Sequence, residues 1–222
     1  MSATFYFVQT VILFISAIIL FVSAYLVFRR APSALLNRLF TIAVGFLGLW
    51  CVFFGVSKIP VFLWEGQVEL ITFKLAYSFL FFALSSYLLS ALFLEFGEDA
   101  FRYRNLVLLS IINLASLGVL WLTDSISLTE IPGDTNTSLL FKLVFFGSSF
   151  LFFLLTFYFY FKTYQASEGS AKENLRWFLI GWILGGGAIV GGVFSDLYQL
   201  LDLIVFLLLA IAAFIQQRAF RT

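Results

Sequence analysis

Seven long apolar runs, separated by short polar or Gly- and Pro-containing breaks, are the feature that most constrains this chain. Each is near the roughly 20 residues that an α-helix needs to cross a bilayer, and none alternates with the period of two typical of a membrane barrel strand. A backbone inside lipid must satisfy its hydrogen bonds internally. The sequence therefore predicts an all-α fold, a polytopic membrane helix bundle of about seven transmembrane helices. The expected spans lie near 4–28, 36–57, 67–95, 104–122, 138–162, 174–195 and 199–217.

The composition agrees with a chain that is embedded in lipid along its whole length. Hydrophobic residues make up 62% of the 222 residues, charged residues make up 11%, and the mean hydropathy is +1.05. Little chain is left for loops, so we expect one seven-helix transmembrane domain over 1–222, with the lipid bilayer as its first partner. The net charge of +1, without a basic stripe, predicts no nucleic-acid partner.

Several kinds of chemistry lack the residues that they need. The chain has no histidine, the commonest ligand of haem and zinc, so we expect no metal site. A retinal protein needs a lysine in its last span, and 199–217 contains none. No carboxylate pair lies at mid-depth in any expected span, which predicts that the chain is not an enzyme. The identity of any cofactor stays unknown.

The basic residues orient the expected bundle. Ten of the 13 Lys and Arg residues flank the breaks on one side of the spans. Cytoplasmic loops carry the excess of Lys and Arg, so this pattern predicts an N-terminus outside and a C-terminus in the cytoplasm. The longest outer segment, 123–137, contains a Pro-Gly-Asp turn signal and is expected to be a loop. The ten basic residues are Arg29, Arg30, Arg38, Arg102, Arg104, Lys162, Lys172, Arg176, Arg218 and Arg221, and the other three are Lys58, Lys74 and Lys142.

Polar side chains inside the spans mark candidate sites, because each costs free energy in hydrocarbon unless it finds a partner or a cavity. Gln9, Ser16 and Ser23 recur every seven residues, which predicts one stripe that faces the bundle interior. Lys74 and Ser78 share a stripe in the third span. The interior stripe is expected to make hydrogen bonds between helices.

Lys74 is the centre of the expected ligand site. It lies about two turns from the outer edge of its span, where it either extends outward or pairs with a carboxylate such as that of Asp202. Together with Glu65, Glu69 and the connection between spans six and seven, it would form an outward-facing pocket for a small molecule. The alternative is a Lys74–Asp202 pair that joins two helices and binds nothing. The predicted ligand-binding residues are Lys74, Ser78, Asp196, Tyr198 and Asp202.

Two helix surfaces are candidates for close packing or for an interface. Small residues on one face of span six either let another backbone approach closely or mark a bend, and the glycines of span two are the expected partner surface. Phenylalanines cover nearly every side of span five, which predicts contact with lipid, with another subunit or with a pigment. The residues concerned are Gly181, Gly185, Ala188 and Gly192 in span six, and Phe145, Phe152 and Phe159 in span five.

Three short segments resemble a known family. Asn37-Arg38-Leu39-Phe40, Leu49-Trp50 and Phe73-Lys74-Leu75-Ala76-Tyr77 are similar to motifs in the N-terminal seven-transmembrane sensory region of bacterial histidine kinases. The resemblance implies a sensory role, an outward N-terminus and a place in the bacterial inner membrane, and it supplies no binding residues. In those kinases catalytic domains follow the last span, and here no transmitter follows it. We therefore expect the output to belong to a separate protein, or the module to have become a structural subunit.

Three functions follow from these patterns. The leading expectation is a non-enzymatic sensory module that passes a signal through the last two spans to a cytoplasmic or membrane protein partner. The alternative is an accessory or scaffold subunit of a multiprotein membrane complex, with or without pigment, held by the phenylalanine and glycine surfaces. A small-molecule transporter comes third, because paired Gly or Pro breaks in matching spans are missing.

Overall fold

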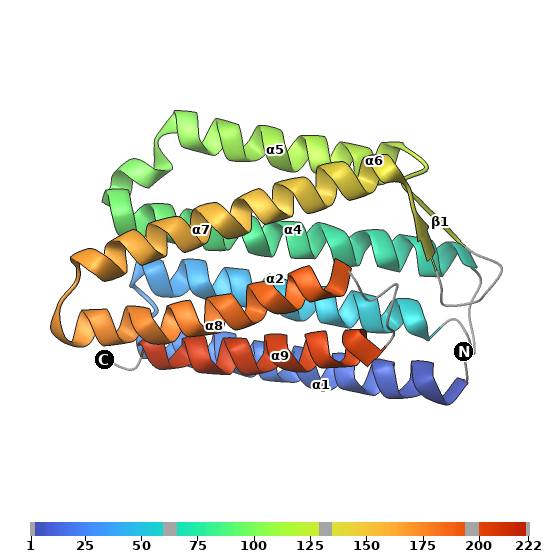
Figure 1. Cartoon of the computed structure of the whole chain (residues 1–222), viewed down its shortest axis with the longest axis horizontal. Coiled ribbons are helices and arrows are strands. Elements are labelled where there is room, and N and C mark those ends of the chain that lie inside the picture. Colours follow the sequence, from blue (N-terminus) through green and yellow to red (C-terminus); the bar gives the residue numbers. More distant parts are fainter. Residues whose placement is uncertain (1–2, 60–65, 129–134, 194–199, 221–222) are drawn as a thin grey trace.

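The computed structural model describes residues 3–59, 66–128, 135–193 and 200–220. In these ranges seven long helices run along one common axis, and each runs antiparallel to the long helix before it (Figure 1). Six of the expected spans each correspond to one long helix, with ends that differ by a few residues, and the fifth, 138–162, is covered by the short helix Leu139–Phe141, the π-helical turn Lys142–Phe146 and the long helix Gly147–Ala166 together, so the all-α prediction is confirmed. The long helices are α1 (Ala3–Arg30), α2 (Leu35–Lys58), α4 (Gly66–Phe96), α5 (Tyr103–Leu122), α7 (Gly147–Ala166), α8 (Gly169–Val193) and α9 (Leu200–Gln216).

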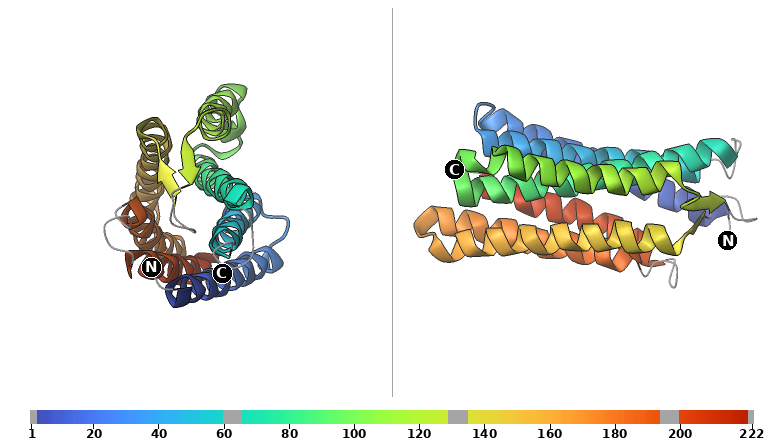
Figure 2. Two further views of the ribbon diagram at one scale, coloured as in Figure 1. Left: turned by 90° about the vertical axis from the view of Figure 1, so that its right-hand side faces the viewer. Right: turned by 90° about the horizontal axis from the view of Figure 1, so that it is seen from above.

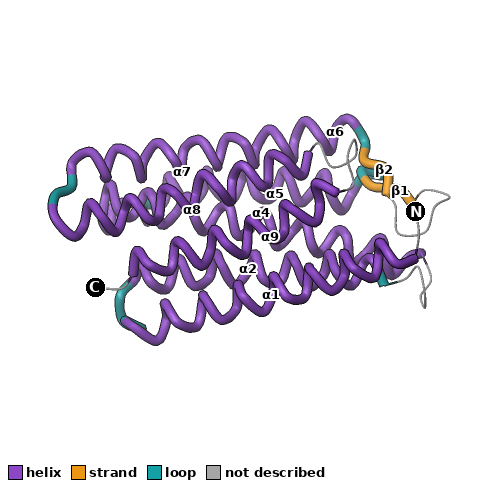
Figure 3. Tube along the Cα trace, turned by 60° about the horizontal axis from the view of Figure 1, so that its bottom comes forward, coloured by secondary structure: helices purple, strands orange, loops and turns teal. Residues whose placement is uncertain are grey.

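Shorter elements connect or extend the long helices. The expected loop after α5 contains an antiparallel hairpin of β1 (Ile126–Leu128) and β2 (Thr135–Thr137), in which Ile126 is paired with Thr137. Strands of three residues are too short to show an alternating pattern, so the sequence did not predict them. The hairpin lies at the end of the bundle that also carries the N-terminus (Figure 3). The other short elements are η1 (Gly97–Phe101), α6 (Leu139–Phe141), the π-helical turn η2 (Lys142–Phe146) and η3 (Gln217–Phe220).

Six of the long helices form a ring. Going round it, the neighbours are α1, α2, α4, α7, α8 and α9, and α9 closes the ring against α1. The remaining helix, α5, lies outside the ring against α4 (Figure 2). In its most apolar stretch only 11% of the residues of α5 are buried, compared with 56% for α2. The ring therefore holds the core, and α5 is peripheral.

The lengths and compositions of the helices fit a lipid bilayer. Among the described residues, five helices are long and apolar enough to cross a membrane, and a shorter apolar helix covers Ile204–Phe220. This supports an integral membrane protein with transmembrane helices. The five stretches are Phe5–Arg30, Leu35–Lys58, Gly66–Phe101, Arg104–Leu122 and Leu139–Ala166.

The interior stripe of α1 is confirmed. Gln9, Ser16 and Ser23 are all buried, at 1%, 0% and 1% exposure. Ser16 Oγ donates a hydrogen bond to the carbonyl oxygen of Phe206 in α9, at 3.1 Å. The seven-residue spacing thus identified the face of α1 that packs into the ring.

Basic side chains gather at one end of the bundle. Because the long helices alternate in direction, the described members of the ten basic residues lie at the end opposite the hairpin (Figure 1). Arg102 forms an ion pair with Asp99 at 2.9 Å, and Lys162 forms one with Glu95. This basic end is the end expected to be cytoplasmic, and the orientation itself stays a prediction.

Candidate functional site

Lys74 and Ser78, two of the predicted ligand-binding residues, face the peripheral helix. The indole Nε1 of Trp121, at the end of α5, donates a hydrogen bond to Ser78 Oγ at 3.0 Å. Ser78 Oγ in turn donates to the carbonyl oxygen of Lys74 at 2.9 Å. Lys74 Nζ lies 5.8 Å from the centroid of the Trp121 ring, within the range of a cation–π contact. This cluster attaches α5 to α4.

The same stripe of α4 continues to hold α5 further along the bundle. Ser85 Oγ lies 2.8 Å from Asn113 Oδ1, and Ser116 of α5 and Ser148 of α7 bring their hydroxyl oxygens within 3.4 Å. These contacts are side-chain hydrogen bonds between partly buried groups. We name the contact between α4 and α5, formed by Lys74, Ser78 and Ser85 with Asn113 and Trp121, the polar seam. The contact between Ser116 and Ser148 joins α5 to α7 and is not part of it. Hydrogen bonds between polar side chains are one of the ways in which membrane helices associate without a hydrophobic driving force.

The rest of the predicted ligand site is only partly visible. Asp196 and Tyr198 lie outside the described residues, and for Asp202 the structure describes its place in α9 and not its side chain. Lys74 faces α5, whereas α9 packs against α8 and α1 on the other side of the bundle (Figure 2). The structure brings Lys74 and Ser78 together with Trp121. Their grouping with the three residues near α9 stays a prediction.

A second lysine, Lys58 at the end of α2, lies inside the bundle and was not predicted as a site residue. Its side chain is 8% exposed, and its Nζ lies 5.1 Å from the ring centroid of Phe54, 5.7 Å from that of Phe73 and 6.0 Å from that of Tyr6. Three rings from α1, α2 and α4 therefore surround one ammonium group. The negative faces of aromatic rings stabilise a cation in such a box.

Glu69, one turn before Phe73 on α4, is buried at the same end of the bundle. It is 5% exposed, and both Glu69 and Lys58 have interaction partners. A sequence signal for both existed. Lys58 follows the buried Cys51 by seven residues, and Glu69 precedes the buried Ala76 by seven, so each continues an apolar stripe. If these apolar stripes are followed to the ends of α2 and α4, they predict that both charged side chains lie inside the bundle.

The glycine face of α8 packs against α9. A Cβ atom added at Gly181 would lie 2.7 Å from the carbonyl oxygen of Ala212 and would overlap Gln216 Cγ. A Cβ at Gly185 would lie 3.4 Å from that of Ala212. We name this contact, formed by Gly181 and Gly185 with Ala212 and Gln216, the glycine seam. Close packing of α8 on α9 therefore explains why small residues are needed at Gly181 and Gly185.

The expected partner of that face was wrong, because it is α9 and not α2. Two glycines of α2 pack on α1 instead: a Cβ at Gly48 would lie 2.8 Å from Phe21 Cε1, and one at Gly55 would lie 3.3 Å from Leu13 Cβ. Helix neighbours follow from the ring order, which hydropathy does not encode. Ala188 of α8 is buried as well, at 2% exposure, whereas for Gly192 the structure describes only its place in the helix.

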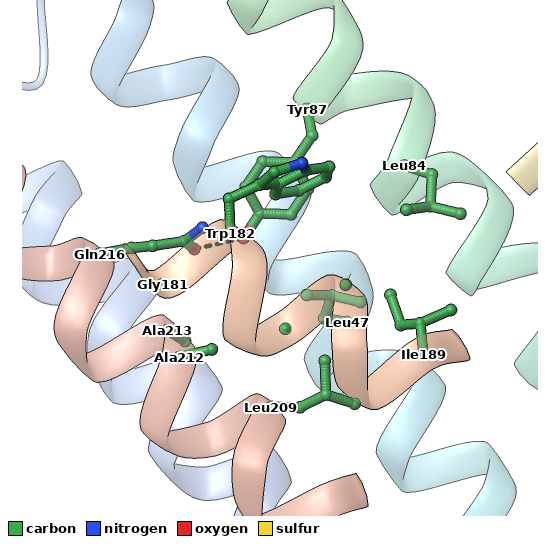
Figure 4. A pocket seen from close by; sticks show the side chains of 12 residues that line it. Leu47, Leu84, Tyr87, Gly181, Trp182, Ile189, Leu209, Ala212, Ala213 and Gln216 are labelled. Carbon is green, nitrogen blue, oxygen red and sulfur yellow. Dashed lines mark hydrogen bonds between the residues drawn. The ribbon is translucent and has the colours of Figure 1, made fainter. Parts of the chain in front are cut away.

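A small cavity lies at the glycine seam, in the centre of the ring (Figure 4). Its volume is ≈ 20 Å³, which holds about one water molecule. At one edge Tyr87 Oη of α4 donates a hydrogen bond to Gln216 Oε1 at 3.0 Å, and the Tyr87 ring lies 4.7 Å from that of Trp182 (Figure 4). The sequence did not single out Tyr87 and Gln216. Both are buried, and they join α4 to the end of α9.

The phenylalanines of α7 that the sequence singled out pack mainly within the chain. Phe145, in η2, and Phe152 are buried against α4, where Phe81 lies 5.5 and 5.4 Å from them. Phe159 makes an edge contact with Phe96 at 5.6 Å. Packing against α4 therefore accounts for Phe145 and Phe152, and other residues of α7 face outward.

Some interior hydrogen-bonding capacity is unused. Among the described side chains, three buried polar atoms have no hydrogen-bond partner, which is uncommon in protein interiors. Trp50 of α2 is one of them, and its ring lies 5.3 Å from that of Phe206 in α9. The three atoms are Trp50 Nε1, Ser149 Oγ and Thr156 Oγ1.

Comparisons with known proteins add no family. No protein-family model matches the chain, and a sequence comparison with curated proteins gives no match. In the part of the chain that the structure describes, no three His, Cys, Asp or Glu side chains come together as a metal site would require. The resemblance to the kinase sensory region stays a prediction, and function has to be argued from the geometry of the bundle.

Proposed function

We propose that the chain is a non-enzymatic, seven-span membrane sensor of the bacterial inner membrane, with its N-terminus outside and its C-terminus in the cytoplasm. It responds to a small molecule at the end of the bundle that carries Lys58 and Glu69, and it acts on a protein partner at the basic end. The observation that carries this proposal is the burial of two charged residues, Lys58 and Glu69, in the interior of the ring.

Buried charges support a sensory role because they are costly in a membrane interior and usually mark function. Lys58 lies among side chains from α1, α2 and α4, so a change at its ammonium group acts on three helices at once. In a surrounding of low dielectric constant, a charged or strongly polar ligand near Lys58 or Glu69 interacts more strongly than it would in water.

The glycine seam supports transmission toward the basic end. Helices in close contact through small residues can shift by about 1–2 Å against each other, which is a common switching movement. A shift of α9 changes the Tyr87–Gln216 hydrogen bond to α4 and the hydrogen bond from Arg30 Nη1 to the carbonyl oxygen of Gln217, at 2.9 Å. Both contacts lie at the basic end, beside the last described turn of the chain. A partner at that end would detect the shift.

The test is a ligand screen that compares two lysines from the same end of the bundle. The wild-type protein in mild detergent is screened with small polar molecules by its Tm. Lys58→Met removes the buried charge, and Lys142→Met removes an exposed one. At 100-fold excess over Kd, a ligand should raise the Tm of wild type and Lys142→Met by roughly 5–10 °C, and should not raise that of Lys58→Met.

Cys51 provides the folding control for this screen. It is the single cysteine and is fully buried, so protection from a thiol reagent reports that a variant is folded. A folded Lys58→Met protein that binds every ligand found as tightly as the wild type would contradict the proposal.

The accessory-subunit function is the second candidate, because α5 offers a wide apolar surface. Leu108, Ile111 and Leu114 are 59%, 58% and 69% exposed. Purification from native membranes, with mass spectrometry and an absorption spectrum of the same sample, distinguishes the two functions. Stoichiometric membrane partners, with or without pigment, that are lost when Leu114 is replaced by Asn would favour the subunit. A chain that purifies alone would favour the sensor.

A further inference from the structure

The outer surface of α9 carries an apolar stripe that ends in an arginine. Leu207, Ile211 and Phe214 are 43%, 50% and 48% exposed, and they recur at intervals of four and three residues, so they lie on one face. Arg218 in η3 follows Phe214 by four residues and is also exposed. The stripe faces away from the ring, and its guanidinium group lies at the basic end.

The neighbouring helix α1 repeats this pattern. Ile18, Val22 and Tyr25 are 62%, 50% and 59% exposed, at intervals of four and three, and the exposed Arg29 follows after four more residues. Because α1 and α9 are adjacent in the ring, the two stripes lie on neighbouring helices and both arginines lie at the basic end (Figure 1). Two apolar strips with a cation at the end of each match the two acyl chains and the anionic headgroup of a phospholipid.

The segment η3 brings further groups to the same place. Arg218 Cζ lies 5.1 Å from the ring centroid of Trp177 in α8, and the side chain of Arg30 is anchored by its hydrogen bond to Gln217. The contact with Trp177 uses one face of the Arg218 guanidinium group and leaves its N–H edges available. Tryptophan is enriched at the level of the lipid headgroups, which agrees with a site at the membrane surface.

The described cations at this end differ in whether a carboxylate is paired with them. On the side of α4 and α7, Arg102 and Lys162 each have a carboxylate partner. Arg29, Arg30 and Arg218 have no carboxylate partner within the described residues. A group of three guanidinium groups without a counter-ion attracts an anion, and phosphate suits guanidinium geometry because it accepts two parallel hydrogen bonds.

We propose that the surface formed by α1, α9 and η3 binds an anionic phospholipid. The phosphate lies between Arg29 and Arg218, with Arg30 close by, and the acyl chains follow the two exposed stripes. Basic groups between membrane helices are a known way of holding anionic headgroups. The inference rests on the chain being an integral membrane protein, and it does not depend on the sensory function.

Native mass spectrometry of the whole protein in detergent tests this site. Dioleoyl phosphatidylglycerol and dioleoyl phosphatidylcholine are added at equal concentrations, and Kd is obtained from the bound fractions. Arg29→Gln/Arg218→Gln is compared with Arg102→Gln/Arg104→Gln, which removes the same charge from the other side of the same end. We expect phosphatidylglycerol to bind more tightly than phosphatidylcholine. Arg29→Gln/Arg218→Gln should raise the Kd of phosphatidylglycerol by about tenfold or more, and Arg102→Gln/Arg104→Gln should raise it by less than about twofold.

Three outcomes would overturn the proposal. Equal binding of the two lipids would show that the headgroup charge is not recognised. Equal weakening by both variants would show that only the overall charge matters. Displacement of phosphatidylglycerol by an equal concentration of inorganic phosphate would show a site for free phosphate, without a role for the acyl stripes. Both variants change exposed residues, and Cys51 protection shows whether they are folded.

Discussion

Two pairs of helices in this bundle are held together by different kinds of contact. The polar seam joins α4 to α5, and the glycine seam joins α8 to α9. Each joins two antiparallel apolar helices that are neighbours in the sequence. At the glycine seam, missing side chains let a backbone carbonyl and a methylene group come close to Gly181. At the polar seam, hydrogen bonds such as the one from Trp121 to Ser78 connect helices whose surfaces remain largely uncovered.

The difference shows what decides burial in a membrane bundle. Lipid is as apolar as the side chains, so apolar area alone does not draw one helix to another. Close packing of small residues yields dense van der Waals contact along α8 and α9, whereas hydrogen bonds fix α5 at a few points. We therefore expect the glycine seam to carry more of the stability, and the polar seam to tolerate change.

The largest effect should come from a bulky residue in the glycine seam. In Gly181→Leu the new side chain meets the carbonyl oxygen of Ala212, which cannot rotate away, so we expect a loss of about 3 kcal/mol or more, or failure to fold. The free energy of unfolding is measured by titration with a denaturing detergent and followed by labelling of Cys51. Gly181→Ala serves as the milder variant if the leucine protein does not fold.

Two glycines provide controls for that change. A Cβ at Gly187 of α8 or at Gly118 of α5 would meet no atom within 4 Å. Leucine there brings the same gain in helix propensity without a clash, so stability should stay the same or rise. If Gly187→Leu destabilises as much as Gly181→Leu, the clash with α9 is not the cause.

A smaller effect should come from the hydrogen bond that accompanies the glycine seam. Tyr87→Phe removes the donor to Gln216, and Gln216→Leu removes the acceptor. A double-mutant cycle should give a coupling of about 0.6–1.7 kcal/mol, the range found for such bonds in membranes. A coupling near zero would mean that the bond between α4 and α9 contributes nothing to the folded state.

The smallest effect should come from the polar seam. Lys74→Met and Trp121→Leu break the cation–π contact, and because Lys74 is half-buried we expect a coupling of about 0.5–1 kcal/mol in the same unfolding assay. Cys51 should stay protected, because α5 lies outside the ring. A folded Lys74→Met protein that loses a ligand response would restore Lys74 to the binding site and contradict its role as an attachment for α5.

Most of the helical content could be predicted from the sequence, and most of the site could not. The limits of α1, α2 and α4 agree with the apolar runs because backbone hydrogen bonding and lipid leave few other structures possible. The interior face of α1 followed from Gln9, Ser16 and Ser23, whose spacing matches a helix. Lys58 was read as an end charge, because the positive-inside rule counts charges near span ends without asking which way they face. Glu69 was expected in a pocket with Lys74, which instead faces α5.

The sequence could not predict which helices contact each other. Gly181 and Gly185 were recognised as a close-packing surface, but their partner α9 was not. Lys74 and Ser78 were recognised as a polar stripe, yet the group that they meet, Trp121, lies 43 residues after Ser78. A stripe of polar or small residues shows which face of a helix makes a special contact. It does not show which of the other helices in the bundle contacts that face.

The sequence by itself determined that this chain is a bundle of apolar helices, the limits of α1, α2 and α4 to within a few residues, and the end of the bundle at which the basic residues gather. These properties depend on local hydrogen bonding, on hydropathy and on the alternation of helix direction. Only the tertiary structure decided that six helices close a ring while α5 stays outside, and that Lys58 enters an aromatic box while Lys74 faces α5. Those choices depend on side-chain shape across helix contacts, because in lipid hydrophobicity no longer distinguishes inside from outside.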